Sequence, residues 1–246
     1  MRLLYHQLTL QGDREINQDS MAYCIGHDFA LFVVADGLGG HHAGEKASRF
    51  FCAGLSKNVD SFAQLMGNQP AATMALWIDA AVEDMRVLFE DDPAAFAAHT
   101  TCAILYLDHK RVLTAHCGDS RVYRLNPREI VWRTRDHSVP QEMLDEGKIT
   151  ESEMGGHPEQ HCLLRSINAA KGNESEINIY PAARAGETFV LCSDGFWGKA
   201  KAQELLQLAQ PGSGLNALEK IARLSLLRAN GRSDNITVQW VRCLSP

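Results

Sequence analysis

Two stretches of the sequence resemble each other, Phe32-Val33-Val34-Ala35-Asp36-Gly37 and, later in the chain, Phe189-Val190-Leu191-Cys192-Ser193-Asp194-Gly195. In both stretches an apolar, β-rich run closes on an Asp-Gly step. Asp-Gly is also a preferred hairpin turn, but a hairpin needs a second strand directly after the turn. A predicted helix follows each step instead. A carboxylate at the end of a buried strand, with glycine beside it, is typical of a site for a hard cation.

Three further aspartates are candidate ligands. Asp119 lies in Gly118-Asp119-Ser120, Asp234 lies in Ser233-Asp234-Asn235, and Asp19 ends a polar stretch. Asp119 and Asp234, each taken alone, are also typical of plain turns. Oxygen ligands without a His or Cys spacing favour Mg²⁺ or Mn²⁺ over zinc. If these carboxylates converge, bound cations are needed to offset their mutual repulsion.

Composition excludes several classes of protein. The chain has 246 residues, 45% of them hydrophobic, and a formal net charge of −6. No basic block exists to neutralise nucleic-acid phosphates or to dock on anionic lipid. The longest apolar run, residues 29–35, is far too short to span a bilayer, and the N-terminus lacks a signal-peptide pattern. The seven cysteines have no CxxC pair and favour free thiols in a reducing compartment, so we expect a cytoplasmic protein.

Hydrophobic periodicity predicts an α+β layered sandwich with sheet in the middle and a pair of helices on each side. The second helix of the first pair places apolar residues along one stripe. Successive strands joined by tight turns indicate antiparallel pairing. The predicted strands are Ala30–Ala35, Thr101–Leu107, Val112–Cys117, Val122–Leu125, Ile130–Arg133, Ile177–Tyr180, Thr188–Cys192 and Ile236–Val241, and the predicted helices are Ala43–Val59, Ala71–Phe89, Lys201–Ala209 and Leu215–Arg228.

The segment from Ser138 to Leu164 differs from the rest of the chain. It is polar, contains several glycines and a proline, and includes one short helical piece around residues 141–146. We interpret it as a long insertion with little core of its own. Loops of this length inside a compact domain are usually functional or mobile.

Seven short motifs, taken in order, resemble those of the metal-dependent protein phosphatase family, also called protein phosphatase 2C. The resemblance runs from about Leu8 to Val241, and the chain length and the Asp-His-Ser segment resemble the bacterial branch. Each motif alone is weak, whereas the ordered set is specific. The motifs begin at Asp13-Arg14-Glu15, Val34-Ala35-Asp36, Gly44-Glu45-Lys46, Gly118-Asp119-Ser120, Arg135-Asp136-His137, Cys192-Ser193-Asp194 and Ser233-Asp234-Asn235.

The resemblance implies a four-layer αββα sandwich, with a central antiparallel β-sandwich flanked by helix pairs. It implies one catalytic domain over residues 1–246, with a flap-like insertion at about 138–164. It also implies two or three Mn²⁺ or Mg²⁺ ions per chain. Asp36 matches the carboxylate that bridges two metals, and the Gly37 carbonyl matches a ligand of the second metal.

The remaining site residues are carried over in the same way. Asp194 and Asp234 match ligands of the first metal, and Asp19 matches an acidic position that reaches the second. Asp119, together with Asp194, matches the position that holds a third metal. Arg14 resembles the arginine that binds phosphate; without the motif context, a surface ion pair with a neighbouring acid would be the simpler interpretation.

The implied mechanism is direct attack on phosphorus by a water that two metals activate, with no covalent intermediate. Arg14 would hold two phosphate oxygens in a fork. Many relatives carry a histidine directly after the Asp-Gly step as the proton donor, but here the residue is Leu38, which cannot donate a proton. His41 and His42 lie nearby, although a structural or exposed position suits them better. We interpret His137 as structural.

Three functions compete. The first is an active serine/threonine protein phosphatase, with phosphorylated proteins as substrates, a serine/threonine kinase as a plausible partner, and a monomeric state. The second is a catalytically inactive relative that binds phosphoproteins, which would typically lack a metal aspartate; Asp36, Asp194 and Asp234 are all present. The third is an esterase with Ser120 as nucleophile, which we discard because no suitable downstream histidine exists.

Overall fold

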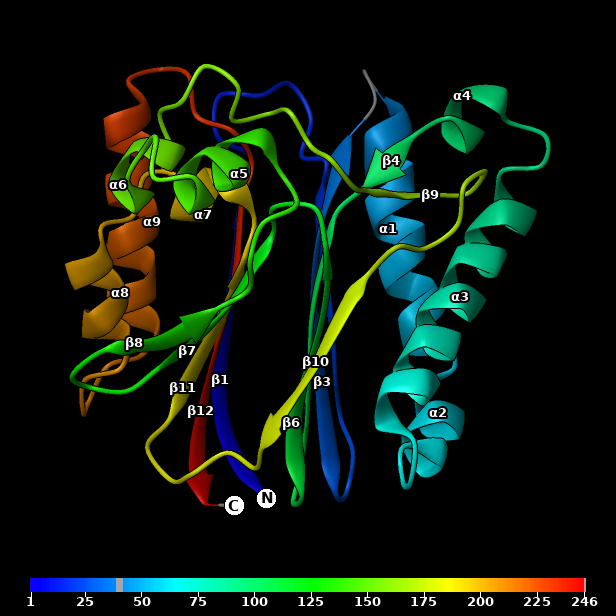
Figure 1. The fold of residues 1–246 in the computed structure, drawn as a ribbon, viewed down its shortest axis with the longest axis horizontal. Helices are drawn as coiled ribbons and strands as arrows, with labels where there is room; N and C mark the ends of the chain where they lie inside the picture. Colours follow the sequence, from blue (N-terminus) through cyan, green and yellow to red (C-terminus); the bar gives the residue numbers. More distant parts are fainter. Residues whose placement is uncertain (39–41, 246) are drawn as a thin grey trace.

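Two antiparallel sheets, stacked face to face, form the centre of the computed structural model, which describes residues 1–38 and 42–245, without the side chains of His42 and Ala94 (Figure 1). The first sheet has the order β1 (Arg2–Leu10), β12 (Ile236–Ser245), β11 (Thr188–Cys192), β7 (Arg121–Leu125), β8 (Ile130–Arg133). The second has the order β10 (Glu176–Pro181), β6 (Arg111–Cys117), β5 (Cys102–Asp108), β3 (Phe29–Leu38), β4 (His99–Thr100), β9 (Ile167–Asn168), with β2 (Asp19–Ile25) paired to β3.

Helices cover both outer faces of the stacked sheets. In Figure 1, α1 (His42–Lys57), α2 (Val59–Leu65) and α3 (Pro70–Leu88) lie beside the second sheet. The first sheet is covered by α8 (Ala202–Leu208) and α9 (Leu215–Ala229). Four short helices complete the described fold: α4 (Pro93–Phe96), α5 (Val139–Asp145), α6 (Glu151–Met154) and α7 (Asp194–Trp197).

Three separate apolar cores lie between these four layers. Phe51 and Trp77 of the α1–α3 layer pack in one cluster with Val33 of β3. Trp240 of β12 packs with the α8–α9 layer in a second cluster. A third cluster, which includes Phe32, fills the space between the sheets. Removal of this apolar surface from water is the main favourable term of folding. The predicted αββα sandwich is therefore confirmed.

Most predicted elements appear with small shifts at their ends, and two boundaries bear on the site. Strand β3 continues through Asp36 and Gly37 to Leu38, so the first Asp-Gly step lies inside the strand and does not close it. Helix α7 starts directly at Asp194. The sequence interpretation omitted β1, β2, β4 and β9 as strands. In β1 and β2 polar and apolar residues mix on half-buried positions, which weakens the alternation that predicts a strand.

The insertion at 138–164 has more structure than the sequence indicates. It contains α5 and α6, and an antiparallel bridge joins Ser138 to Leu163 where the segment leaves and returns. Met154 of α6 is fully buried and belongs to the core beneath α8 and α9. Met154 thus packs into a core that other elements build, and the expectation that the insertion has little core of its own stays a prediction. One apolar residue among polar neighbours forms no periodic pattern, so the sequence does not reveal this contact.

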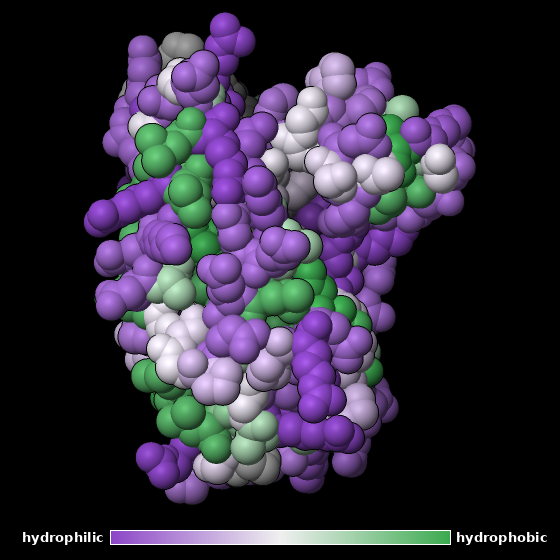
Figure 2. All heavy atoms as spheres, turned by 90° about the vertical axis from the view of Figure 1, so that its left-hand side faces the viewer, coloured by the Kyte–Doolittle hydropathy of each residue, from purple (hydrophilic) through white to green (hydrophobic). Residues whose placement is uncertain are grey.

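The termini and the insertion lie at opposite ends of the sandwich (Figure 1). Figure 2 shows the face of α8 and α9, which is largely hydrophilic with scattered hydrophobic patches. Among the described residues, no helix has the length and apolar character that a membrane span requires.

Candidate metal centre

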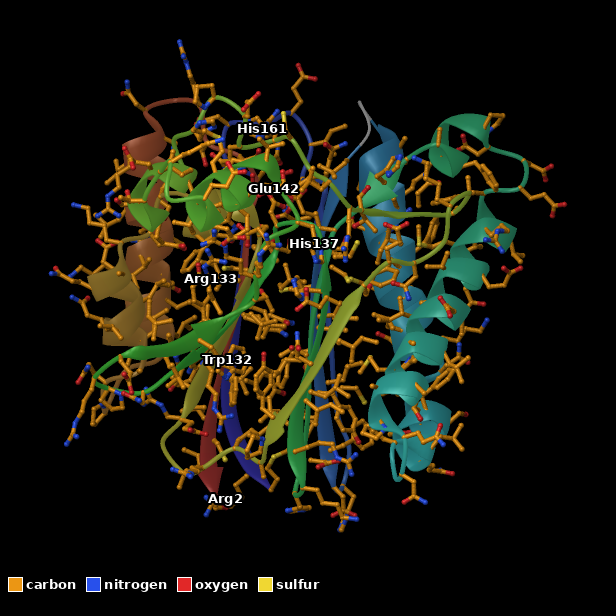
Figure 3. The ribbon with its side chains drawn as sticks, viewed as in Figure 1. Arg2, Trp132, Arg133, His137, Glu142 and His161 are labelled. Carbon is orange, nitrogen blue, oxygen red and sulfur yellow. The ribbon has the colours of Figure 1, made fainter. Side chains whose placement is uncertain are left out.

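Four of the predicted aspartates meet at the end of the sandwich that carries the insertion. Asp19 and Asp36 are direct partners in the β2–β3 register of the second sheet. Asp194 follows β11 and Asp234 precedes β12, both in the first sheet. Burial, followed by Asp19 and Asp194, raises the pKa of Asp36 well above its usual range. Figure 3 places His161 at this same end and Arg2 at the opposite one.

Asp36 and Gly37 are held by backbone hydrogen bonds on both sides. The Asp36 N–H donates to Thr101 Oγ1 at 3.0 Å, and the Thr101 N–H donates to the Asp36 carbonyl at 2.8 Å. A Cβ on Gly37 would lie 2.0 Å from the Gly44 carbonyl oxygen, at the start of α1. Glycine is therefore required at position 37 because two backbones approach closely there.

Asp19 links the two sheets. The Ser193 hydroxyl donates to Asp19 Oδ2 at 2.7 Å and accepts the Thr237 N–H at 3.0 Å. The other carboxylate oxygen, Oδ1, is buried and has no hydrogen-bond partner among the described residues. Burial raises the pKa of Asp19 to about 7, although the bond from Ser193 opposes the shift. An unpaired buried oxygen of this kind is costly unless a cation binds it.

Asp194 is likewise a buried carboxylate with one oxygen that pairs with no described residue. Its Oδ2 accepts from Gln160 Nε2 at 3.1 Å and lies 4.0 Å from His161 Nδ1, while its Oδ1 is buried without a partner. Burial, followed by the charge of Asp234, raises the pKa of Asp194 to about 6. One potential ligand atom from each of His161, Asp194 and Asp234 lies within 4.8 Å of the others.

Asp119 lies close to this group but in a separate turn. Gly118 precedes it with a φ of 93°, a conformation that favours glycine. The Asp119 carbonyl accepts from Trp197 Nε1 at 2.9 Å, and its carboxylate is buried. Burial, then the charge of Asp194, raises the pKa of Asp119 well above its usual range. The structure thus brings Asp119 into the electrostatic environment of Asp194.

Arg14 forms its ion pair with a predicted metal ligand. Its Nη2 lies 2.7 Å from Asp234 Oδ2, with the two side chains 56% and 27% exposed. This bond and the charge of Asp234 raise the pKa of Arg14. The simpler interpretation, a pair with a sequence neighbour, is wrong: Asp13 accepts a bond from the Ser233 N–H instead. Arg14 is therefore exposed at the rim of the aspartate cluster.

Sequence reasoning missed four residues that position the cluster: Thr101, Gln160, His161 and Ser193. Ser193 belongs to the echoed motif, which was its only signal. Gln160 and His161 lie in the polar insertion, where no pattern distinguishes one side chain from another.

The histidines of the sequence analysis fall into two groups. The His137 ring stacks on His116 at a centroid distance of 4.7 Å, and the Gly118 N–H donates to His137 Nδ1 at 3.3 Å. These contacts suit the structural role expected for His137. His41 and the side chain of His42 lie outside the described residues, so the proton-donor hypothesis for them has no structural counterpart here.

The donor set fits hard divalent cations. The clustered ligand atoms are mainly carboxylate oxygens, which Mg²⁺ and Mn²⁺ prefer. Two of these oxygens, Asp19 Oδ1 and Asp194 Oδ1, are buried and lack partners. Several carboxylates held this close cannot all ionise at neutral pH unless positive charge joins them. The geometry therefore defines a candidate centre for divalent cations between two sheets.

Known proteins are similar to this chain in sequence. The sequence model of the family described as Protein phosphatase 2C matches residues 11–221. Serine/threonine protein phosphatase PstP of Mycobacterium tuberculosis is 32% identical over 213 residues, which are 85% of this chain and 39% of that protein. Serine/threonine phosphatase stp of Listeria monocytogenes is 29% identical over 217 residues, covering 86% of this chain and 83% of that protein.

Solved structures agree with the sequence comparison. The crystal structure of PstP/Ppp from Mycobacterium tuberculosis has a TM-score of 0.84 and 29% identity, covering 99% of both chains. A structure of the PstP catalytic domain in complex with 2 manganese ions has a TM-score of 0.80 and 29% identity, covering 98% of this chain and 97% of that one.

The fold and the aspartate cluster define an αββα sandwich with a centre for divalent cations at one end. With the family match over most of its length, the chain belongs to the protein phosphatase 2C family. It spans 39% of the length of the PstP that it matches.

Proposed function

We propose that this protein is a metal-dependent serine/threonine protein phosphatase. The observation that carries the proposal is the convergence of Asp19, Asp36, Asp194 and Asp234 from two sheets, with two buried carboxylate oxygens lacking partners. The relatives named PstP and stp are serine/threonine phosphatases, which supports the same substrate class here.

The site residues take the roles that the family resemblance implies. Asp36 would hold two Mn²⁺ or Mg²⁺ ions, and the Gly37 carbonyl would hold the second of them. Asp194 and Asp234 would hold the first ion. Asp19 would hold the second, and its buried Oδ1, which pairs with no described residue, supports this role. Asp119 and Asp194 would offer a third, weaker position, which the effect of the Asp194 charge on the buried Asp119 supports.

When bound, a pair of divalent cations lowers the pKa of a shared water toward neutrality and offsets the charge of the phosphate. The chain supplies the rest of the chemistry. Arg14 exchanges its bond to Asp234 for two phosphate oxygens, and this exchange needs little movement because its side chain is exposed at the rim. Leu38 donates no proton, so protonation of the leaving oxygen falls to solvent or to a bound water.

The wider setting of the enzyme is part of the proposal. Residues 1–246 form one catalytic domain with a flap at about 138–164. The protein acts as a monomer, and every proposed metal ligand comes from a single chain. We place it in the cytoplasm, since all seven cysteines are free thiols and suit a reducing compartment. Its substrates are phosphorylated proteins, and a serine/threonine kinase that modifies them is the natural partner.

Hydrolysis of a phosphothreonine peptide tests the proposal. Activity should require added Mn²⁺ or Mg²⁺, disappear with a chelator, and return with excess metal. Asp36→Ala should abolish it, while Asp60→Ala, at an exposed carboxylate of α2, should not. Full activity after exhaustive chelation would exclude the metal-dependent mechanism. A protein that binds phosphopeptides but never hydrolyses them would be the inactive relative.

A further inference from the structure

A small cavity opens directly beside the aspartate cluster, with a volume of about 140 Å³. Asp194 and Asp234 form part of its lining, and Arg14 lies at the same cavity. Lys199, which follows α7, and Arg232, which follows α9, complete the charged part of the wall. The cavity is therefore continuous with the position where the phosphate would be bound.

Arg232 carries a positive charge that the described part of the chain leaves unneutralised. Its side chain is exposed and forms no ion pair or hydrogen bond with a described residue. The backbone at Arg232 is held in place, because its N–H donates to the Ala229 carbonyl at 3.1 Å. Asn230 and Gly231, both with positive φ, form the turn that brings the chain back toward the cavity.

Lys199 also carries a positive charge that no described carboxylate neutralises. Its Nζ donates to the Gly155 carbonyl at 2.9 Å, and no described carboxylate pairs with it. The neighbouring arginine of α9, Arg228, differs: it binds Glu204 through two hydrogen bonds of 2.7 and 2.5 Å. Arg228, next to the cavity, thus has an acidic partner in Glu204, and Arg14, in the cavity wall, has one in Asp234, whereas Lys199 and Arg232 pair with no described carboxylate.

We propose that Lys199 and Arg232 form an anion subsite that binds an acidic group of the substrate next to the phosphate being removed. The inference rests on the proposed phosphatase function and adds a preference among its substrates. The anion is either the carboxylate of a flanking Asp or Glu or a second phosphate. Both fit, because arginine forks bind carboxylate and phosphate alike.

Charge balance supports the assignment. When metal ions are bound, they would neutralise the carboxylates of Asp194 and Asp234, and the Arg14 side chain would contact the phosphate of the substrate. Lys199 and Arg232 then dominate the local charge of the cavity wall. Complementary charge beside a reacting group selects among partners and speeds their encounter more than it tightens binding overall. A peptide with neutral flanks would leave both cations without an anion.

Three peptides of one sequence test the subsite. One carries a single phosphothreonine with glutamine flanks, the second has glutamate flanks, and the third has a second phosphothreonine. With Mn²⁺, we expect kcat/KM for the glutamate or the doubly phosphorylated peptide to exceed that for the glutamine peptide about threefold or more, mainly through KM. Arg232→Ala should reduce this ratio toward one, and Arg232→Glu should invert it, whereas Arg232→Lys should keep it above one.

Arg223→Glu is the matched control, because Arg223 is an exposed arginine of the same helix region that lines a different surface. In this variant, the ratio of kcat/KM for the anionic peptides to kcat/KM for the glutamine peptide should stay at the wild-type value. A wild-type ratio of one, or an Arg232→Glu ratio equal to that of wild type, would overturn the subsite. A gain for only one of the two anionic peptides would identify the anion it accepts. Wild-type protein that hydrolyses neither these peptides nor p-nitrophenyl phosphate with Mn²⁺ would instead refute the phosphatase function.

Discussion

Asp19 illustrates at the scale of a residue how a buried carboxylate can be unfavourable for folding and useful for binding. Only 8% of the residue is exposed, one oxygen is satisfied by Ser193, and the other has no partner. Burial raises its pKa from an ordinary value near 4 to about 7. The ionised form is therefore disfavoured in the metal-free protein, and a bound cation would remove that penalty.

Asp19→Asn should stabilise the metal-free protein while it lowers metal-dependent activity. Because folding raises the pKa of Asp19, the ionised carboxylate destabilises the folded protein above pH 7. This destabilisation decreases as the pH falls below 7, and it vanishes below about pH 4, where the carboxyl is protonated in both the folded and the unfolded state. We therefore expect the unfolding free energy of the variant, in chelator, to exceed that of wild type by on the order of 2 kcal/mol at pH 8. The difference should nearly vanish at pH 4. Urea unfolding at both values measures it.

Asp60→Asn provides the comparison for this effect, because Asp60 is an exposed carboxylate. Its unfolding free energy should change by less than about 0.5 kcal/mol at either pH. Equal gains for the two variants would mean that net charge, rather than the surroundings of Asp19, sets the stability.

At the scale of an element, helix α6 of the 138–164 segment is joined to the first sheet through Arg121. This buried arginine binds Asp136 through two hydrogen bonds, Nε to Oδ1 at 2.8 Å and Nη2 to Oδ2 at 2.6 Å. Its Nη1 also donates to Glu151 of α6 at 3.0 Å. The guanidinium carbon lies 3.4 Å from the ring centroid of Trp197, at the end of α7. One side chain thus connects β7, α6 and α7.

Arg121→Met should destabilise the protein by about 3 kcal/mol, because it removes both hydrogen bonds to the buried carboxylate of Asp136 and leaves it only the longer contact with Arg133, at 3.6 Å. Arg135→Met is the matched variant: Arg135 also pairs with an aspartate, Asp145, but the two side chains are 50% and 42% exposed. Its cost should stay below about 1 kcal/mol. Urea unfolding compares the two, and equal costs would contradict the importance of burial.

At the scale of the whole molecule, the proposed metal ligands come from both sheets. Asp19 and Asp36 come from the second sheet, while Asp194 and Asp234 belong to the first. Between the sheets lies an apolar core, and the hydrogen bond from Ser193 to Asp19 crosses from one sheet to the other. Ligands from both sheets come together only in the folded protein, so a cation would bind the folded protein and not the unfolded chain. Such binding stabilises the fold.

Added Mn²⁺ should therefore raise the unfolding free energy, by about 2.7 kcal/mol at a concentration one hundred times the dissociation constant. The gain should be larger at pH 7.5 than at pH 5.5, because protons compete for Asp194, whose pKa is about 6, and for Asp19. Thermal unfolding with Mn²⁺ and with chelator measures it. An unchanged Tm, or a shift that is independent of pH, would contradict binding at these carboxylates.

The sequence by itself determined the layered fold, eight of the strands and the four main helices, and the identity of the candidate ligands. Local patterns carry this information: apolar runs, the echoed Asp-Gly step, and motifs whose order along the chain is specific. Such patterns depend on neighbouring residues, which is why β3, β11 and the four main helices were predicted within a few residues of their ends.

The tertiary structure alone decided how the ligands are held. Ser193 binds Asp19 across 174 positions of the chain, and Arg14 pairs with Asp234 across 220. The buried Met154, the contact of Gln160 with Asp194, and the cavity with Lys199 and Arg232 likewise join distant segments. No local pattern encodes these contacts, because they arise only when two sheets and the flap pack together and bury their polar groups at one end.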